Sequence, residues 1–199
     1  RRCRQEHGDV HVAAGTGRTA RLATEQVDRD GPARIAGEVI TQLVDHLRGV
    51  IGGRSAIEIG AGRGWLGRAL GIPMTDAKVM ERPEVRAFYE RTGQPVTPYG
   101  DDVEHLEAMA AIKKYKPDVV IGCWLTQRAL ASDPPGTGSM YGVGESALLC
   151  VVETYIVIGN EGVHGAKRIR ALPHNASFYP WLLSRATRPE LNRIYTWGL

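Results

Sequence analysis

The sequence predicts an α/β fold, in which a doubly wound, mostly parallel sheet ends in a short C-terminal antiparallel strand. Two observations support this prediction. An apolar strand runs directly into a glycine-rich turn and a helix over residues 55–71, and the run Asp118–Trp124 is continuously apolar after its first residue. A strand without polar alternation is typical of a parallel sheet that helices cover on both faces. The other expected strands alternate with helices at the spacing of βαβ units.

The composition predicts one globular domain over residues 31–199, preceded by an irregular N-terminal arm over residues 1–30. The chain has 199 residues, of which 43% are hydrophobic and 24% charged, and this suits a single core. Its net charge of +3 is spread along the chain and defines no nucleic-acid surface. No apolar stretch approaches the ~20 residues of a membrane span, and the polar first residues argue against a secretory leader.

The three cysteines, Cys3, Cys123 and Cys150, are scattered and lack the spacing of a metal site. We therefore expect no bound metal and a reducing, cytoplasmic location. No membrane partner is expected either, and a homo-oligomer is left open.

The remaining elements are predicted from hydrophobic periodicity and from the positions of proline and glycine. Helices are expected over residues 32–47, 65–70, 83–89, 103–116, 145–153 and 178–185. Strands are expected over residues 55–59, 72–76, 95–99, 118–124, 155–159 and 193–197. The segment Thr126–Gly144 is expected to be a long, partly mobile loop, because its centre is rich in residues that break helices and strands.

The most informative segment is Ala56–Gly64, which places an acid two residues before three alternating glycines. Glycine tolerates a positive φ, and its missing side chain lets a ligand lie against the backbone. A dinucleotide fingerprint would need a small third residue where this chain has Trp65, so NAD is disfavoured. The pattern predicts a nucleoside ligand held by the acid and the turn, that is, by Glu58, Gly60, Ala61, Gly62 and Gly64. A plain tight turn is the alternative.

Glu58-x-Gly60-x-Gly62-x-Gly64 resembles the first motif of class I S-adenosylmethionine-dependent methyltransferases. The resemblance implies a Rossmann-like methyltransferase fold and S-adenosyl-L-methionine as cofactor, with the acid toward the methionine ammonium and the glycine loop beneath the rest. The compact pattern looks most like small methyltransferase-like proteins of phage and bacterial genomes.

The resemblance also implies two further acids at strand ends. Asp76 ends the second expected strand and matches the acid that binds ribose hydroxyls, with Glu81 as a competitor. Asp102 follows the third expected strand and matches the acid that receives the adenine amino group. Alternatively, Asp76 is a loop residue, and Asp101 or Asp102 is a helix N-cap.

The acceptor side of the site is less defined. Trp124 follows the fourth expected strand, so it would cover the adenine or line the acceptor pocket, with Thr126 or Gln127 orienting an acceptor. Core packing is the alternative for Trp124. His164 follows the fifth strand and is the candidate catalytic base, because histidine titrates near neutrality; a surface histidine is the alternative.

Asp133-Pro134-Pro135 resembles the proline-containing fourth motif of amino-methylating DNA and RNA enzymes. Two departures favour a loop instead. The tripeptide comes about ten residues after the fourth strand, where that motif belongs, and Gly136 occupies the position of the motif's aromatic residue.

The sequence thus predicts a methyltransferase whose acceptor, a small molecule or a nucleic acid, is undetermined. Methyl transfer from a sulfonium requires mainly alignment and desolvation, so no fixed catalytic residue is obligatory. Two alternatives stay open. One is a non-catalytic binding or structural module with the methyltransferase fold. The other is a nucleotide-dependent oxidoreductase, against which Trp65 argues.

Overall fold

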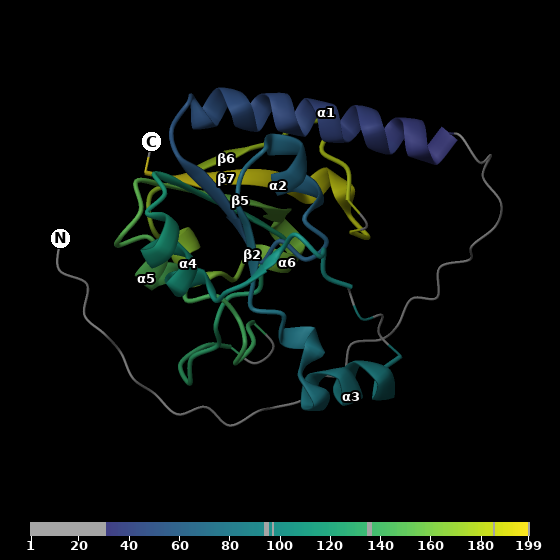
Figure 1. Cartoon of the computed structure of the whole chain (residues 1–199), viewed down its shortest axis with the longest axis vertical. Helices are drawn as coiled ribbons and strands as arrows, with labels where there is room; N and C mark the ends of the chain where they lie inside the picture. The colour runs from purple at the N-terminus through teal and green to yellow at the C-terminus, as the bar shows by residue number, and fades with distance from the viewer. Residues whose placement is uncertain (1–30, 94–95, 97, 135–136, 185, 199) are drawn as a thin grey trace.

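The computed structural model describes residues 31–93, 96, 98–134, 137–184 and 186–198, with side chains from residue 41 onward. The expected N-terminal arm over residues 1–30 and Cys3 lie outside the described residues. Seven strands form one sheet in the order β3-β2-β1-β4-β5-β7-β6 (Figure 1). The strands are β1 (Ala56–Ile59), β2 (Met74–Asp76), β3 (Glu104–His105), β4 (Val119–Cys123), β5 (Thr154–Asn160), β6 (Asn175–Ser177) and β7 (Asn192–Trp197).

Strands β1 to β5 pair in parallel, whereas β7 pairs antiparallel with both β5 and β6. Two antiparallel strands therefore complete the sheet, one more than expected. The chain winds from β1 outward to β3 and then returns to β4 on the other side of β1. Open α/β sheets bind ligands outside the carboxyl ends of the strands at such a switch point.

Helices cover both faces of the sheet. They are α1 (Gly31–Ile51), α2 (Trp65–Leu70), α3 (Pro83–Arg91), α4 (Ala108–Tyr115), α5 (Glu145–Leu148) and α6 (Glu161–His164), with 3-10 turns η1 (Val79–Glu81), η2 (Arg168–Ala171) and η3 (Pro189–Leu191). In Figure 1, α1 and α2 lie along one face, α4 and α5 lie on the other, and α3 stands away from the sheet. Within the described residues, no helix has the length and apolar character to cross a membrane.

The core is divided between the two faces, as a doubly wound sheet requires. In β4, Val119 and Ile121 pack toward α1, while Val120 between them packs toward α4 and α5. All three side chains are fully buried. The continuous apolar run in the sequence therefore reflects two covered faces, and the predicted α/β class, with a doubly wound, mostly parallel sheet, is confirmed.

The third strand was predicted in the wrong place. β3 is Glu104–His105 and pairs with the end of β2, whereas the described part of residues 95–99 forms no strand. A two-residue polar strand has no hydrophobic pattern, so its place is set by pairing alone. The helix expected over residues 103–116 accordingly begins only at Ala108, after Glu107 accepts a hydrogen bond from the Met109 N–H as its N-cap, and it ends at Tyr115, close to the expected end.

Two other helices differ from expectation. No helix forms in the described part of residues 178–185, where Pro180 removes a backbone donor; Tyr179 and Trp181 instead stack on each other and pack against His46 of α1. The helix expected over residues 145–153 ends at Leu148. By contrast, α2 begins and ends as predicted, because Gly71 adopts a left-handed cap with φ 72°.

Candidate functional site

A pocket of about 1330 Å³ opens at the carboxyl ends of β1, β2 and β4. Its inner wall comes from the glycine turn after β1 and from the ends of β2 and β4. Its outer wall comes from α3 and from the loop over residues 126–143. Small-ligand pockets commonly measure roughly 300–1,000 Å³, so this pocket has room for more than one small ligand.

The inner wall depends on backbone conformations that glycine permits. Gly60, Gly62 and Gly64 have φ values of 59°, 54° and 72°. A Cβ on Gly60 would lie 2.2 Å from the Leu125 side chain, and one on Gly64 would lie 2.8 Å from the Met74 sulfur. The turn thus needs glycine for its conformation and, at these two positions, for space. The Ala61 N–H holds the turn against β2 by donating to the Thr75 carbonyl (3.0 Å).

Asp76 at the end of β2 fixes the tip of this turn. Its Oδ2 accepts a hydrogen bond from the Gly62 N–H (2.9 Å), and its Oδ1 accepts one from the Lys78 N–H (2.8 Å). Asp76 lines the pocket, whereas its competitor Glu81 lies in η1 and does not line it. Each carboxylate oxygen has a second lone pair for a ligand hydroxyl.

Glu58 lies in β1 and is buried, yet it borders the pocket. Its Oε2 accepts a hydrogen bond from the Gly67 N–H of α2 (2.7 Å). Burial raises the pKa of Glu58 to about 7, and the neighbouring charge of Asp76 adds to the rise. A cation bound beside Glu58 would favour its charged form, so this carboxyl can respond to a positively charged ligand.

Trp124 stands at the end of β4 in a conformation that non-glycine residues rarely adopt, with φ 57°. Its N–H donates to the Ile158 carbonyl (2.8 Å), and its ring meets the edge of the His164 ring at a centroid distance of 5.2 Å. Strained residues of this kind persist where surrounding contacts hold them, and they cluster at functional sites. The side chain lines the pocket.

His164 does not line the pocket. It is buried in α6, where its Nδ1 accepts a hydrogen bond from the Asn160 N–H (2.9 Å). Burial and the charge of Lys167 lower the pKa of His164 to about 4. The structure thus places the His164 imidazole against the Trp124 ring, as a support for that ring, and outside the pocket lining.

Asp102 also lies outside the pocket lining. Its carboxylate forms a bidentate pair with Arg68, whose Nε and Nη2 lie 2.9 and 2.5 Å from the two oxygens. The reason is the shifted third strand: Asp102 precedes β3 and does not follow a strand end. Neither Asp101 nor Asp102 caps a helix, because Glu107 caps α4. Gly64 is likewise outside the lining and packs against Met74 and Val103.

The loop over residues 126–143 is tied to the chain after α6. Gln127 is buried; its Nε2 donates to the Thr137 carbonyl (2.7 Å), and its Oε1 accepts from the Arg168 N–H (3.0 Å). The Arg168 guanidinium pairs with Asp133 and donates to the Arg128 carbonyl (2.8 Å). Asp133 therefore anchors the loop, in agreement with a loop and not with the fourth methyltransferase motif.

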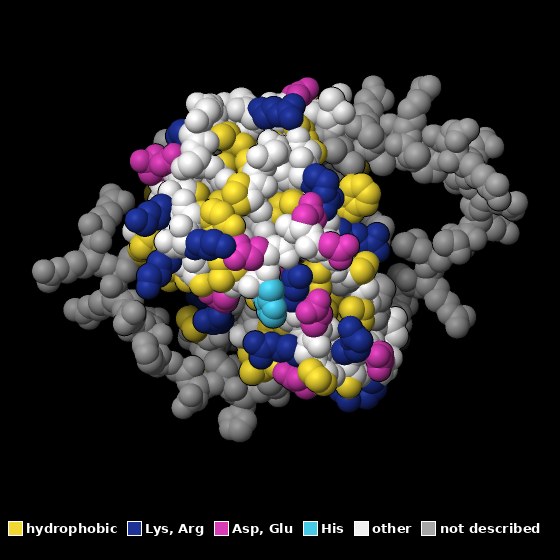
Figure 2. Space-filling model, viewed as in Figure 1, with side chains coloured by type: hydrophobic (Ala, Val, Ile, Leu, Met, Phe, Trp, Pro, Cys, Tyr) yellow, Lys and Arg dark blue, Asp and Glu magenta, His cyan; other side chains and the backbone are white. Residues whose placement is uncertain are grey.

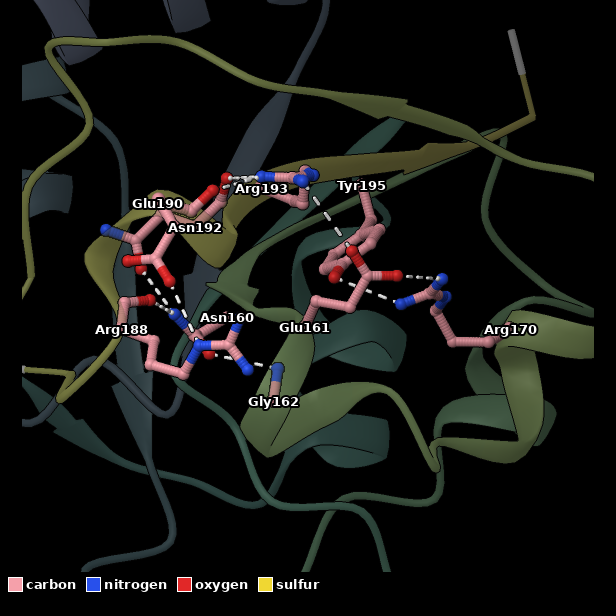
Figure 3. A network of polar contacts seen from close by, with 9 residues as sticks. All are labelled: Asn160, Glu161, Gly162, Arg170, Arg188, Glu190, Asn192, Arg193 and Tyr195. Atoms are coloured by element: carbon pink, nitrogen blue, oxygen red, sulfur yellow. Dashed lines mark hydrogen bonds and ion pairs between the residues drawn. The ribbon is translucent and has the colours of Figure 1, made fainter.

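A polar network beyond β5 holds α6 in place (Figure 3). Glu161 lies between two arginines, with Arg170 Nη2 3.2 Å from Oε1 and Arg193 Nη2 3.7 Å from Oε2. Asn160 donates to Asn192 Oδ1 across the sheet (2.9 Å). Because α6 carries His164, this network also steadies the surface on which Trp124 rests.

Sequence reasoning placed the loop over residues 126–143 at the acceptor side but missed the part of the outer wall that α3 forms. Glu84 and Phe88 are four residues apart on α3 and both line the pocket, with Tyr141 of the loop donating from its hydroxyl to Glu84 (3.3 Å). The signal available in the sequence was the i, i+4 spacing of Glu84 and Phe88, which places both on one side of a short helix. In the structure, the buried residue of this helix is Val85. Nothing local showed that this helix would face the glycine turn.

No family model matches the chain, and no curated protein sequence matches it significantly. Among solved structures, the bifunctional kinase-methyltransferase WbdD is 14% identical with a TM-score of 0.41, over 84% of this chain and 39% of that one. The Thermoplasma acidophilum 1320 protein is 15% identical with a TM-score of 0.37, over 84% of this chain and 88% of that one. DNMT2 of Spodoptera frugiperda is 14% identical with a TM-score of 0.33, over 71% and 49%. The chain thus spans about two fifths of WbdD and half of DNMT2.

Proposed function

We propose that this protein is an S-adenosyl-L-methionine-dependent methyltransferase and that the cofactor occupies the inner part of the pocket. One observation carries the proposal. The left-handed glycine turn after β1 and the Asp76 carboxylate after β2 are hydrogen-bonded to each other on one wall of a pocket at the switch point of the sheet. The bare backbone of the turn and the Asp76 carboxylate therefore face the same space, where a nucleoside could contact both.

The residues of the inner wall suit this cofactor in charge and shape. Its sulfonium and ammonium groups are cationic, and the inner wall carries the carboxyls of Glu58 and Asp76. The bare backbone at Gly60 and Gly62 allows close approach, and the Trp124 ring offers an apolar surface to a base. Asp102, His164 and Gly64 are left out of the proposed site, because none of them lines the pocket.

The cofactor, when bound, supplies the electrophilic methyl group. The chain's part is to bind, orient and exclude water: Asp76 holds the turn, Glu58 offers a charge at the inner end, and Trp124 covers the mouth. No base is assigned to His164, because its Nδ1 already accepts the Asn160 N–H and its pKa is lowered.

The proposal is tested by calorimetry with S-adenosylmethionine, S-adenosylhomocysteine and NAD in parallel. We expect both sulfur ligands to bind and NAD to bind weakly or not at all, since Trp65 occupies the position where a dinucleotide site needs a small residue. Tight NAD binding without S-adenosylmethionine binding would overturn the proposal. Binding of S-adenosylmethionine without methyl transfer to any acceptor would favour the non-catalytic alternative.

Asp76 and Asp102, which the sequence predicted as the ribose and adenine acids of one site, provide a matched pair of variants. Asp76→Ala removes a pocket carboxylate that also holds the Gly62 N–H, so we expect a loss of affinity of about tenfold. Asp102→Ala removes only an exposed pair with Arg68, so we expect affinity to stay within about twofold of the wild type. Equal losses in both variants would mean that Asp102 belongs to the site after all.

A further inference from the structure

The pocket is acidic although the chain is basic. Among the described residues, five acidic side chains but only two arginines line it, whereas the whole chain carries a net charge of +3. On the face shown in Figure 2, lysine and arginine are interspersed with aspartate and glutamate and form no single positive patch. A nucleic-acid strand requires basic side chains against its phosphates, so this pocket does not suit one.

The outer wall offers one carboxylate in an aromatic setting. Asp133 is paired with Arg168, and Glu107 caps α4 with Arg128 3.7 Å away, so both have structural partners. Glu84 instead lies exposed on the first turn of α3. The Tyr141 hydroxyl donates to it at 3.3 Å, and Phe88, 41% exposed, follows one turn later.

Aromatic rings gather at this pocket. Six of the chain's thirteen aromatic residues line it, and three of them, Phe88, Tyr89 and Tyr141, come from α3 and the loop, so the outer wall suits a flat, apolar ligand. Two arginines outside the lining lie over rings of this wall, Arg82 at 5.2 Å from the Tyr141 centroid and Arg91 at 5.7 Å from that of Phe88. Each guanidinium lies over its ring, so a ligand ring would have to stack on the opposite face.

We propose that the methyl acceptor is a small aromatic amine, with its ring against Phe88 and its amine toward Glu84. This inference rests on the proposed function. In the transfer, the ammonium of the acceptor first loses a proton to water, which frees the lone pair of its nitrogen. That lone pair forms the new bond to the methyl carbon as the carbon–sulfur bond breaks, and the pair of the broken bond returns to sulfur, which yields S-adenosylhomocysteine and the methylated ammonium.

The probes are tryptamine and indole-3-propionate, which share a ring and differ in charge, and an oligothymidylate as the nucleic-acid arm. Calorimetry with and without S-adenosylhomocysteine should give tryptamine an affinity about tenfold or more above indole-3-propionate, and no binding of the oligonucleotide. The inference is overturned if indole-3-propionate or the oligothymidylate binds as tightly as tryptamine or more tightly. Failure of S-adenosylhomocysteine itself to bind counts against the proposed function instead, since the ratio between the two indoles is measured separately.

Two pairs of variants test the assigned contacts. Glu84→Gln should bring the ratio between the two indoles toward unity and leave S-adenosylhomocysteine affinity unchanged, whereas Glu90→Gln, on the same helix outside the lining, should keep the ratio. Phe88→Ala should weaken both indoles by about tenfold, whereas Phe178→Ala, an exposed ring elsewhere, should weaken neither. A ratio that survives Glu84→Gln refutes the role of Glu84.

Discussion

The two walls of the pocket are built in different ways. The inner wall is mainly backbone: the left-handed turn at Gly60 and Gly62, the Asp76 carboxylate that accepts the Gly62 N–H, and the strained residue Trp124 after β4. The outer wall is made of side chains from α3 and from a loop about fifty residues away in the chain. The shape of the inner wall changes only if the backbone conformation changes, whereas the outer wall can be altered one side chain at a time. Cofactor binding should therefore be sensitive to φ, and acceptor binding to side-chain identity.

The largest expected effect comes from Gly62→Val, which places a β-branched side chain at φ 54° on the inner wall. We expect cofactor affinity to fall about 100-fold or more, because the side chain fills the backbone approach. The matched control is Gly71→Val, also at a left-handed glycine (φ 72°) but with no atom within 4 Å of its Cβ. Both should lose ~1–2 kcal/mol of stability in thermal unfolding, and only the first should lose binding.

Glu58→Gln separates stability from binding. The pKa of Glu58 is raised from 4.5 to about 7, so the folded state binds more protons between these values and the free energy of unfolding falls as pH rises through this window. Glutamine keeps an acceptor for the Gly67 N–H, so we expect it to stabilise the protein by about 3 kcal/mol at pH 8 and to weaken cofactor binding.

The gain from Glu58→Gln should vanish below about pH 4.5. His164 has the opposite shift, since its pKa falls from 6.5 to about 4, so it lowers stability on acidification. The wild type and Glu58→Gln share the contribution of His164, so it cancels in the difference between their free energies of unfolding. That difference is measured by denaturant unfolding at several pH values. A constant difference across pH would show that Glu58 is not the group responsible.

The contrast between the two walls explains which parts of the molecule the sequence predicted. Local residues determine the glycine turn, β1, α2 and Asp76, because a positive φ, a buried strand and a helix cap each depend on residues that are neighbours in the sequence. β3 and the segment after Pro180 follow from distant partners: β3 pairs only with β2, and Trp181 packs against α1. Asp102 was drawn into the predicted site by the misplaced third strand, and Glu84 was overlooked because its partner Tyr141 is 57 residues away.

Arg168→Ala tests whether the outer wall can loosen independently. Arg168 pairs with Asp133 and donates to the Arg128 carbonyl, so its loss removes both side-chain ties between the loop and the chain after α6 and leaves the backbone hydrogen bond to Gln127. We expect a stability loss of about 2 kcal/mol and weaker tryptamine binding, with S-adenosylhomocysteine affinity unchanged. Arg188→Ala, which removes an exposed pair with Glu190, should cost less than about 0.5 kcal/mol. Loss of cofactor affinity in Arg168→Ala would mean that the two walls form one unit.

A small change in stability is expected from Trp124→Gly, directly after β4 on the inner wall. Glycine relieves the strain at φ 57°, but it adds freedom to the unfolded chain and removes the ring contact with His164. These effects oppose one another, so we expect the free energy of unfolding to change by less than about 1 kcal/mol. Cofactor affinity should nevertheless fall by about three- to tenfold, because the apolar surface for the base is lost, and Trp124→Phe should recover most of it. A large stability loss with unchanged affinity would identify Trp124 as a packing residue. The adenine base would then have to contact another part of the inner wall.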